Sequence, residues 1–289
     1  MSASGPQHDL PVETGHADGT SPHAPFSSLT AMAWLAKETI GDCTLYLGDM
    51  RAVLPELEEG ADLCVTDPPY RLTSGGSRKV TMRGKFHPDR YDNKGDLMRV
   101  LPWPKMPAPI FSALKEDANA YVMANGKNVF PAHSAFVSAG FKFHEQLSWD
   151  KGRITRQPFY ARRQEFTLFF WKGRARHVTH GGVSTLFACP PPDLDWHPTS
   201  KPTSLMALYV LQSSSEGQLV LDPFAGSAAT LLAALAFGRR AIGIELDPVF
   251  FDRSCERLYA AQADGFAQVR GEWERDRLAN RIRGLEYAA

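Results

Sequence analysis

The clearest structural pattern in the chain is one stretch, Leu219-Val220-Leu221-Asp222-Pro223-Phe224-Ala225-Gly226-Ser227. Its leading aliphatic residues predict a buried strand, and the apolar period over residues 228–237 predicts a helix. The acid that ends the strand and the glycine before the helix allow a ligand to approach the backbone closely at the helix N-terminus. This order is typical of a loop that holds a nucleoside cofactor in an open α/β sheet.

An acid also ends the next apolar run. Ile242-Gly243-Ile244 leads into Glu245, and an acid in this place commonly accepts hydrogen bonds from ribose hydroxyls. The order of strand, glycine loop, helix, strand and acid therefore favours a nucleoside-binding segment over residues 219–245.

A second site is predicted by Asp67-Pro68-Pro69-Tyr70, which directly follows the apolar run over residues 63–66. The two prolines end the strand and stiffen the loop, so Asp67 and Tyr70 stand at the carboxyl edge, where open α/β sheets bind ligands. There Asp67 and the main-chain carbonyl of Pro68 can accept both hydrogens of an amino group on an aromatic ring, and Tyr70 offers a flat face for stacking. Taken alone, the tetrapeptide is equally compatible with a proline-rich turn that exposes an acid.

Short apolar runs alternate with helical patterns from residue 35 onward, which is typical of strands and crossover helices in a mainly parallel sheet. We predict a doubly wound α/β fold with seven strands, at residues 44–47, 63–66, 120–123, 145–149, 166–171, 219–221 and 241–244. Helices are expected at residues 50–57, 107–114, 127–138, 204–212, 228–237, 248–261 and 272–283.

The predicted organisation is a single domain over residues 31–289, because the chain is too short for two full domains and a linker. Residues 1–30 are rich in small and polar residues and are predicted to form a disordered tail. Residues 71–105 are basic and too long for an ordinary connection, which suggests a function for them. Residues 174–196 interrupt the alternation a second time.

The composition excludes several classes of protein. Lys and Arg (32) balance Asp and Glu (32), which argues against a strongly basic nucleic-acid protein when the whole chain is averaged. The balance is uneven, since residues 142–176 hold nine Lys or Arg against three acids. The four cysteines lack CxxC spacing, so neither a zinc site nor a disulfide framework is expected. Because no apolar run could span a membrane and no signal peptide is evident, we expect a cytoplasmic protein.

In the order of its motifs the sequence resembles the permuted, β-group DNA amino-methyltransferases, in which the catalytic half precedes the cofactor half. The family's Asp-Pro-Pro-Tyr, His-Pro-Thr-x-Lys-Pro, Asp-Pro-Phe-x-Gly-Ser and Gly-Ile-Glu motifs match residues 67–70, 197–202, 222–227 and 243–245. An upstream Gly-Asp matches Gly48-Asp49. The resemblance implies a circularly permuted, Rossmann-like methyltransferase fold that depends on S-adenosylmethionine.

The resemblance also implies the reaction, which is methyl transfer to the exocyclic amino group of a base flipped out of double-stranded DNA. The catalytic residues that it implies are Asp67, Pro68, Pro69 and Tyr70. The cofactor contacts that it implies are Asp49 near the adenine, Glu245 on the ribose, Lys201 near the methionine carboxylate, and Asp222, Phe224, Gly226, Ser227, His197, Thr199 and Thr203. No metal is required. The group's target-recognition segment corresponds to residues 174–196, and the basic residues 71–105 are a second expected DNA contact.

Adenine N6 is the expected acceptor because the tetrapeptide begins with Asp. Cytosine N4 stays open as an alternative, since both acceptors present the same NH2 chemistry. A non-catalytic DNA-binding regulator is a third reading, for which the sign is Ala228 where the family usually has glycine; we expect Ala228 to begin the helix without strain. The resemblance further implies a bacterial or phage-encoded restriction-modification enzyme. The sequence leaves open whether the protein forms a homodimer and whether it has a cognate restriction nuclease.

Overall fold

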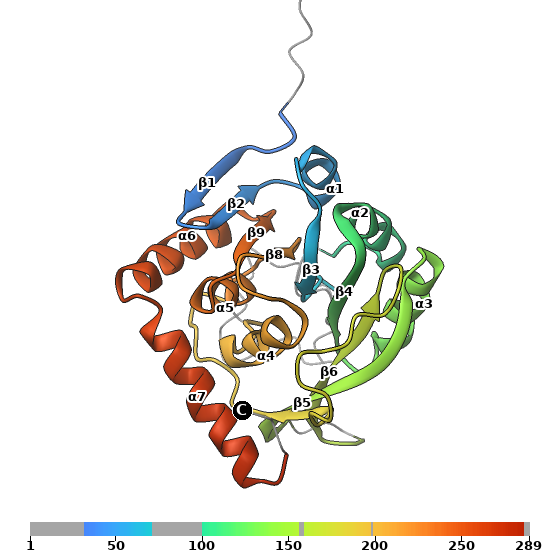
Figure 1. Ribbon diagram of the computed structural model, residues 1–289, viewed down its shortest axis with the longest axis vertical. Coiled ribbons are helices and arrows are strands. Elements are labelled where there is room, and N and C mark those ends of the chain that lie inside the picture. The colour runs from blue at the N-terminus through green and yellow to red at the C-terminus, as the bar shows by residue number, and fades with distance from the viewer. Residues whose placement is uncertain (1–31, 71–99, 156–158, 198, 286–289) are drawn as a thin grey trace, which may run out of the picture. The chain divides into compact units, whose positions relative to one another are not determined.

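The computed structural model describes residues 32–70, 100–155, 159–197 and 199–285. The predicted tail over residues 1–30 and most of the basic connection, residues 71–99, lie outside the described residues. All elements below belong to one unit, Ala33–Ala289 (Figure 1). No helix among the described residues is long and apolar enough to cross a membrane.

Nine strands of the described residues form one sheet, in the order β1-β2-β9-β8-β3-β4-β6-β5-β7. Their bounds are β1 Ala36–Ile40, β2 Cys43–Leu47, β3 Ala61–Thr66, β4 Leu114–Ala124, β5 Lys142–Thr155, β6 Arg162–Trp171, β7 Leu186–Ala188, β8 Leu219–Asp222 and β9 Arg240–Glu245. The central strands β2, β9, β8, β3 and β4 are all parallel to their neighbours among these five. Their carboxyl ends therefore lie along one edge of the sheet, the carboxyl edge.

The sheet confirms the predicted doubly wound α/β class and contains all seven predicted strands, but the predicted strand number was too low. The two additional strands are β1 and β7, which are the two edge strands of the sheet. β1 reads Ala-Lys-Glu-Thr-Ile, in which polar residues alternate with apolar ones, and β7 has only three residues before a run of prolines. Neither carries the continuous apolar run by which the central, doubly covered strands were recognised.

Helices cover both faces of the sheet (Figure 1). One face carries α4 Thr203–Ser213, α5 Ala229–Ala236, α6 Pro248–Ala263 and α7 Ala267–Ile282, and the other carries α1 Met50–Val53, α2 Pro107–Ala113 and α3 Val129–Ser138. A 3-10 turn, η1 Leu54–Glu56, continues α1 where a single helix over residues 50–57 was predicted, and η3 Trp103–Lys105 precedes α2.

The two covered faces have separate apolar cores. In β4, Tyr121 and Met123 belong to the core beneath α4 and α5, whereas Ala120 and Val122 belong to the core that includes Phe136 of α3. Successive side chains of a strand point to opposite faces, so a strand covered on both sides reads as continuously apolar. This arrangement explains why the periodicity of the sequence predicted the central strands well.

The conformation of Ala228 differs from the prediction. Ala228 does not begin the helix but is the N-cap residue of α5, in the left-handed region with φ +62°. It lies in the turn that joins β8 to α5, where its N–H donates to the carbonyl of Ala225 at 2.8 Å. A left-handed residue with a Cβ costs roughly 1–2 kcal/mol. The expectation that Ala228 fits without strain was therefore wrong, because the chain needs a positive φ one residue before the helix.

Gly243 of β9 lets the glycine loop, residues 223–227, pack against the sheet. A Cβ added at Gly243 would lie 2.5 Å from Leu231 Cδ1, 2.8 Å from Leu45 Cδ1 and 3.2 Å from the Cβ of Ala225. Both leucine side chains are fully buried, so neither can move aside without disturbing the core.

We predict that Gly243→Ala lowers the free energy of unfolding by about 1–3 kcal/mol, because the added methyl overpacks the core. Gly271→Ala is the matched control: Gly271 lies in α7 and no atom comes within 4 Å of an added Cβ there. This control is expected to raise stability by about 0.5–1 kcal/mol through helix propensity. Urea denaturation measures both variants, and equal stabilities for the two would contradict the packing argument.

Candidate functional site

Acidic residues mark the ends of four neighbouring strands at the carboxyl edge. Asp49 follows β2, Glu245 ends β9, Asp222 ends β8, and Asp67 follows β3. The hydroxyl of Thr66 donates to Asp222 Oδ1 at 2.7 Å across the β3–β8 boundary. The structure thus brings the predicted catalytic loop and the predicted cofactor loop, which are far apart in the sequence, to adjacent strand ends.

The carboxylates of Glu245 and Asp222 hold the backbone around the glycine loop. Glu245 Oε2 accepts from the N–H of Gly226 and Oε1 from the N–H of Asp247, both at 2.8 Å. Asp222 Oδ1 also accepts from the N–H of Phe224 at 3.1 Å. Burial raises the pKa of Glu245 to about 7 and that of Asp222 to about 6, against the lowering effect of these hydrogen bonds. Both acids therefore titrate near neutral pH.

The imidazole of His197 lies directly over Gly226. A Cβ at Gly226, whose φ is +52°, would come within 2.9 Å of His197 Nε2, so glycine is required here both for the conformation and for the space. Burial lowers the pKa of His197 to about 3, helped by the charges of Lys201 and Arg257, so the ring is neutral. Ser200 Oγ and Ser227 Oγ lie 2.6 Å apart and join the His-Pro-Thr segment to the loop.

Asp67-Pro68-Pro69-Tyr70 lies at the end of β3 as predicted. Tyr70 is 7% exposed, and its ring stacks on that of Trp103 with 6.0 Å between centroids and 14° between planes. Trp103 is held in turn by a hydrogen bond from its Nε1 to Asn128 Oδ1 at 3.0 Å. Burial raises the pKa of Tyr70 well above its usual range, so the phenol is neutral. The aromatic wall is therefore fixed in place.

Lys201 connects the His-Pro-Thr segment to Asp67. Its ammonium donates to Asp67 Oδ2 and, at 3.2 Å, to the carbonyl of Thr199. It also lies 3.7 Å from Glu165 Oε2. Asp67 Oδ1 is buried and has no hydrogen-bond partner among the described residues. One oxygen of this carboxylate therefore pairs with an ammonium, and the other can still accept a hydrogen bond.

Three of the predicted cofactor residues have their side chains engaged elsewhere, and Lys201, which was expected near the methionine carboxylate, is one of them through its ion pair with Asp67. The hydroxyl of Thr203 donates to Glu272 of α7. Asp49 caps α1 through the N–H of Arg51 at 2.9 Å and forms an ion pair with the Arg51 side chain. Both residues nevertheless lie near the carboxyl edge, because Thr203 begins α4 and Asp49 follows β2.

Glu165, Lys151 and Trp103 belong to the same cluster and were not predicted as site residues. Trp103 and Glu165 lie outside every motif from which the site was predicted. Their roles depend on strand register: β6 places Glu165 opposite Trp149 of β5, which brings Lys151 Nζ to 3.0 Å from Glu165 Oε1. The motifs of the sequence did not indicate these charge partners, because they depend on the pairing of β5 with β6.

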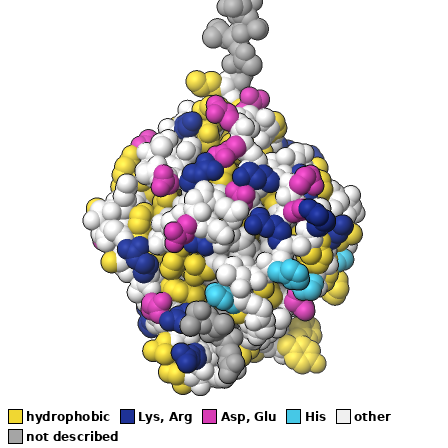
Figure 2. All heavy atoms as spheres, viewed as in Figure 1, with side chains coloured by type: hydrophobic (Ala, Val, Ile, Leu, Met, Phe, Trp, Pro, Cys, Tyr) yellow, Lys and Arg dark blue, Asp and Glu magenta, His cyan; other side chains and the backbone are white. Residues whose placement is uncertain are grey.

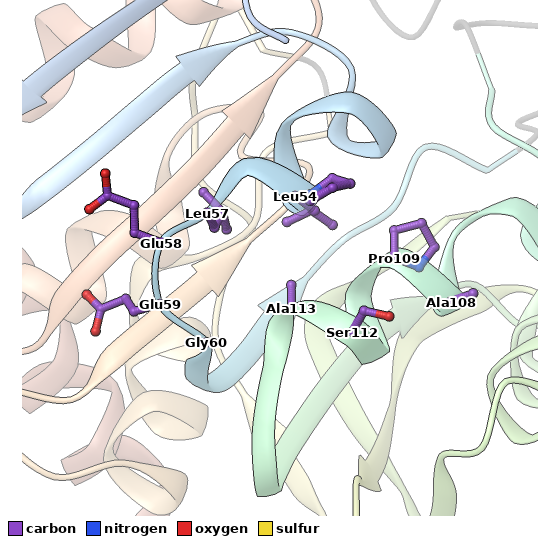
Figure 3. A pocket seen from close by; sticks show the side chains of 10 residues that line it. Leu54, Leu57, Glu58, Glu59, Gly60, Ala108, Pro109, Ser112 and Ala113 are labelled. Atoms are coloured by element: carbon purple, nitrogen blue, oxygen red, sulfur yellow. The ribbon is translucent and has the colours of Figure 1, made fainter.

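A separate pocket of about 520 Å³ lies at the opposite edge of the sheet (Figure 3). Leu54, Leu57 and Glu58 line one wall, and Pro109 and Ser112 of α2 line the other. Gly60 immediately precedes β3, so this pocket opens at the amino ends of the strands. It is therefore remote from the acids of the carboxyl edge, where the chemistry-bearing residues gather.

The family model for N6 and N4 enzymes, described as a DNA methylase, matches residues 61–256. The chain belongs to the N6/N4 DNA methylase family. It is 43% identical over 269 residues to the DNA adenine methyltransferase YhdJ of Escherichia coli (strain K12), an alignment that covers 78% of this chain and 87% of that protein. This methylase therefore resembles an adenine enzyme over most of its length.

Solved structures support the fold. M1.HpyAVI in complex with S-adenosylmethionine superposes with a TM-score of 0.58 at 19% identity, covering 75% of this chain and 99% of that one. The cytosine-N4-specific PvuII DNA methyltransferase superposes with a TM-score of 0.58 at 17% identity, covering 80% and 97%. This methylase thus has the fold of S-adenosylmethionine-dependent methyltransferases, with the Asp67 loop ahead of the glycine loop in the chain.

The residues of the carboxyl edge fit S-adenosylmethionine. Gly226 has no side chain to cover its backbone, and it stands in the turn that leads through Ser227 and the N-cap Ala228 into α5. Glu245 and Asp222 supply carboxylate acceptors of the kind that nucleoside hydroxyls and amino groups require. The loop therefore has the glycine backbone and the hydrogen-bonding groups that suit a nucleoside with a sulfonium tail.

We predict that the affinity for S-adenosylmethionine rises as pH increases through about 7. The pKa of Glu245 is raised to about 7 in the ligand-free protein, so the carboxyl is protonated below that value and ionised above it. Ribose hydroxyls donate best to the ionised form, so binding and deprotonation favour each other.

Calorimetric titration at pH 6, 7 and 8 measures the affinity. Glu245→Gln is the test variant, because its amide carries no titrating charge. It is expected to bind about tenfold more weakly at pH 8, since one hydrogen bond to a charged group is lost. Its pH dependence should be weaker than that of the wild type, because Asp222 is then the remaining acid of the loop that titrates near neutral pH, and an equally steep pH dependence in this variant would contradict the assignment to Glu245.

Proposed function

We propose that this methylase transfers a methyl group to N6 of adenine in double-stranded DNA. The observation that carries the proposal is the carboxylate of Asp67, which has one available oxygen and stands next to the glycine loop across the β3–β8 boundary. An acceptor at this place faces the amino group of a base that enters the carboxyl edge beside the cofactor.

A base amino group is a poor nucleophile because its lone pair is delocalised into the ring. Asp67 Oδ1 and the carbonyl of Pro68 accept its two hydrogens and localise that lone pair on nitrogen as the new bond forms. When bound, S-adenosylmethionine would supply the electrophilic methyl group, and its sulfur would keep the electron pair of the S–C bond that breaks. The methylated nitrogen then loses one hydrogen as a proton, which Asp67 Oδ1 can take and pass to water. The role of Lys201 in this proposal is to keep Asp67 ionised, because its ammonium is engaged by Asp67 and by the carbonyl of Thr199.

Tyr70 provides the surface against which the flipped base stacks, with Trp103 behind it. On the cofactor side, Glu245 is assigned to the ribose, and Asp222, Phe224, Gly226 and Ser227 form the loop. His197 and Thr199 are assigned to the opposite wall of the cofactor site, and Asp49 and Thr203 are assigned to the two ends of that site.

Adenine is favoured over cytosine as the target base by two observations. The tetrapeptide begins with Asp, and the similar YhdJ is named as an adenine methyltransferase. Against this stands the fold likeness to PvuII, a cytosine-N4 enzyme, but at 17% identity it concerns the fold alone. Cytosine N4 is therefore the alternative that the product assay must distinguish.

The DNA is proposed to approach the carboxyl edge. The face in Figure 2 shows basic and acidic side chains interspersed over its described residues, so charge alone does not mark the binding surface there. Within the expected recognition segment, residues 174–196, residues 187–189 are buried in the sheet and core, which leaves the flanking residues for DNA. The basic residues 71–99 remain a proposed contact outside the described residues.

The β5–β6 hairpin is a further DNA contact that the exposed side chains support. β5 runs parallel to β4, because each is antiparallel to β6, so the hairpin projects from the carboxyl edge. Phe159 and Tyr160 in it are 92% and 90% exposed, and Arg153 and Arg162 flank them. Exposed aromatic rings beside guanidinium groups suit bases and phosphates.

We further propose that the protein acts in the cytoplasm, where the DNA lies. We also propose two partners, a second copy of the chain and a cognate restriction nuclease. Analytical ultracentrifugation with and without DNA tests the first partner. A sedimentation coefficient that stays that of a monomer over the whole concentration range would exclude a homodimer.

The deciding experiment incubates the protein with DNA and labelled S-adenosylmethionine, digests the DNA to nucleosides and identifies the product by mass. We expect N6-methyladenine from the wild type. Asp67→Ala should lower kcat roughly 10²–10³-fold, the usual loss when one acceptor aimed at developing charge is removed. Asp42→Ala, an exposed acid at the amino end of β2, is the control and should keep full activity. N4-methylcytosine as the product would replace the adenine assignment by its alternative.

We predict that Phe159→Ala combined with Tyr160→Ala weakens DNA binding about tenfold, the loss expected when stacking contacts are removed. Affinity for S-adenosylmethionine and thermal stability should be unchanged, because both rings are exposed and remote from the core. Leu278→Ala on α7, where the side chain is 56% exposed, is the control for loss of an exposed apolar group. Fluorescence anisotropy with labelled duplex measures the affinity, and equal losses in both variants would remove the hairpin from the DNA contact.

A further inference from the structure

Four charged side chains form a line of alternating sign behind the catalytic loop. Lys151 Nζ lies 3.0 Å from Glu165 Oε1, and Glu165 Oε2 lies 3.7 Å from Lys201 Nζ, which in turn donates to Asp67 Oδ2. The side chains are largely buried, with exposed fractions of 16% for Lys151, 22% for Glu165 and 8% for Lys201. The line comprises two cations and two anions and is therefore neutral as a whole.

The fold alone does not account for Glu165. The pairing of β6 with its neighbours involves only the backbone of Glu165. An apolar side chain would fit a position this buried without the free-energy cost of desolvating a charge. Burial raises the pKa of Glu165, but Lys201 and Lys151 together outweigh it and hold that pKa below its usual range. Glu165 therefore stays ionised, and its carboxylate faces the ammonium of Lys201, which is bonded to Asp67.

Lys201 is shared between two carboxylates as a result. Burial lowers the pKa of Lys201, yet Asp67 and Glu165 outweigh it and raise that pKa, so the ammonium stays charged. An ammonium has three hydrogens, and the carbonyl of Thr199 takes one of them. Glu165 draws the cation to the side of Asp67 that bears Oδ2, and Oδ1 stays without a partner.

We propose that Glu165 is a positioning residue for methyl transfer: it holds Lys201 on the Oδ2 side of Asp67 and so leaves Oδ1 free to accept the amino hydrogen of the target base. The inference rests on the proposed function, in which Asp67 Oδ1 is the acceptor for an amino hydrogen of the target base. Without the negative charge of Glu165, Lys201 pairs with Asp67 alone, covers both of its oxygens and weakens the carboxylate as an acceptor.

The pH behaviour of Asp67 follows from the groups that face it. These are Lys201 from the segment before α4, Glu165 from β6, Asp222 from β8 and Tyr70 of its own loop. Burial raises the pKa of Asp67, Lys201 lowers it, and the charge of Glu165 raises it further. Removing the Glu165 charge therefore shifts the titration of Asp67 to lower pH, and the acid limb of kcat moves in the same direction.

Glu165→Gln is the test, because the amide keeps the shape of the side chain and an oxygen for Lys151 while removing the charge. We expect kcat to fall about ten- to a hundredfold, the range that a small misplacement of a reacting group produces. KM for DNA and the affinity for S-adenosylmethionine should stay within about twofold of wild type, since the binding surfaces are intact. Glu145→Gln, an exposed acid of β5, is the matched control and should leave kcat unchanged.

Carboxyl 13C NMR supplies a readout that does not depend on activity, with Asp67→Asn used to assign the Asp67 resonance. A shift of the Asp67 titration to lower pH in Glu165→Gln supports the proposal, and an unchanged titration with unchanged kcat overturns it. Should Glu165→Gln fold poorly, the double variant with Lys151→Gln keeps the line neutral and is measured in the same way.

The two proposals fail differently. A wild-type protein that methylates no base contradicts the proposed function, and the NMR titration alone then decides whether Glu165 acts on Asp67. A wild type that methylates adenine while Glu165→Gln does so equally well, with the same acid limb, contradicts only the role of Glu165.

Discussion

The parallel pairing of β3 with β8 is the constraint on which the site depends. It aligns the ends of two strands, of which one is followed by the Asp67 loop and the other by the glycine loop. The hydrogen bond from Thr66 to Asp222 joins the two strand ends. A displacement of either strand along the other would separate the carboxylate of Asp67 from the glycine loop. The apolar cores on both faces of the sheet therefore do more than stabilise the fold, because they fix this alignment.

Burial shapes the electrostatics of the carboxyl edge. Taken out of water, Asp222 and Glu245 bind protons more readily than in solution, whereas Lys201 keeps its charge because two carboxylates surround it. In such a poorly solvated region each hydrogen bond to a charged atom counts for more than at the surface. The site thus combines acids that respond to pH near neutrality with a cation that does not.

The sequence predicted the parts of the site that follow from strand ends. Asp67, Asp222 and Glu245 each close a continuous apolar run, and parallel strands bring such ends to one edge, so their proximity could be inferred. The partners of Lys201 could not be inferred, because they depend on how the segment before α4 crosses that edge. Glu165 required the register of β5 and β6, β7 was too short to show a pattern, and apolar periodicity does not distinguish the first helical residue from the N-cap, which is why Ala228 was assigned wrongly.

Side chains that contact one another in the site are far apart in the sequence and are therefore synthesised at different times. Lys201 reaches Asp67 across 134 positions, and Thr66 reaches Asp222 across 156. Synthesis proceeds from the N-terminus, so the Asp67 loop leaves the ribosome well before β8 and the glycine loop. A nascent or prematurely terminated chain that ends before β8 lacks Asp222, Gly226 and Glu245, and so has no glycine loop beside Asp67. The Asp67 loop is therefore made long before the strand that aligns it with the glycine loop.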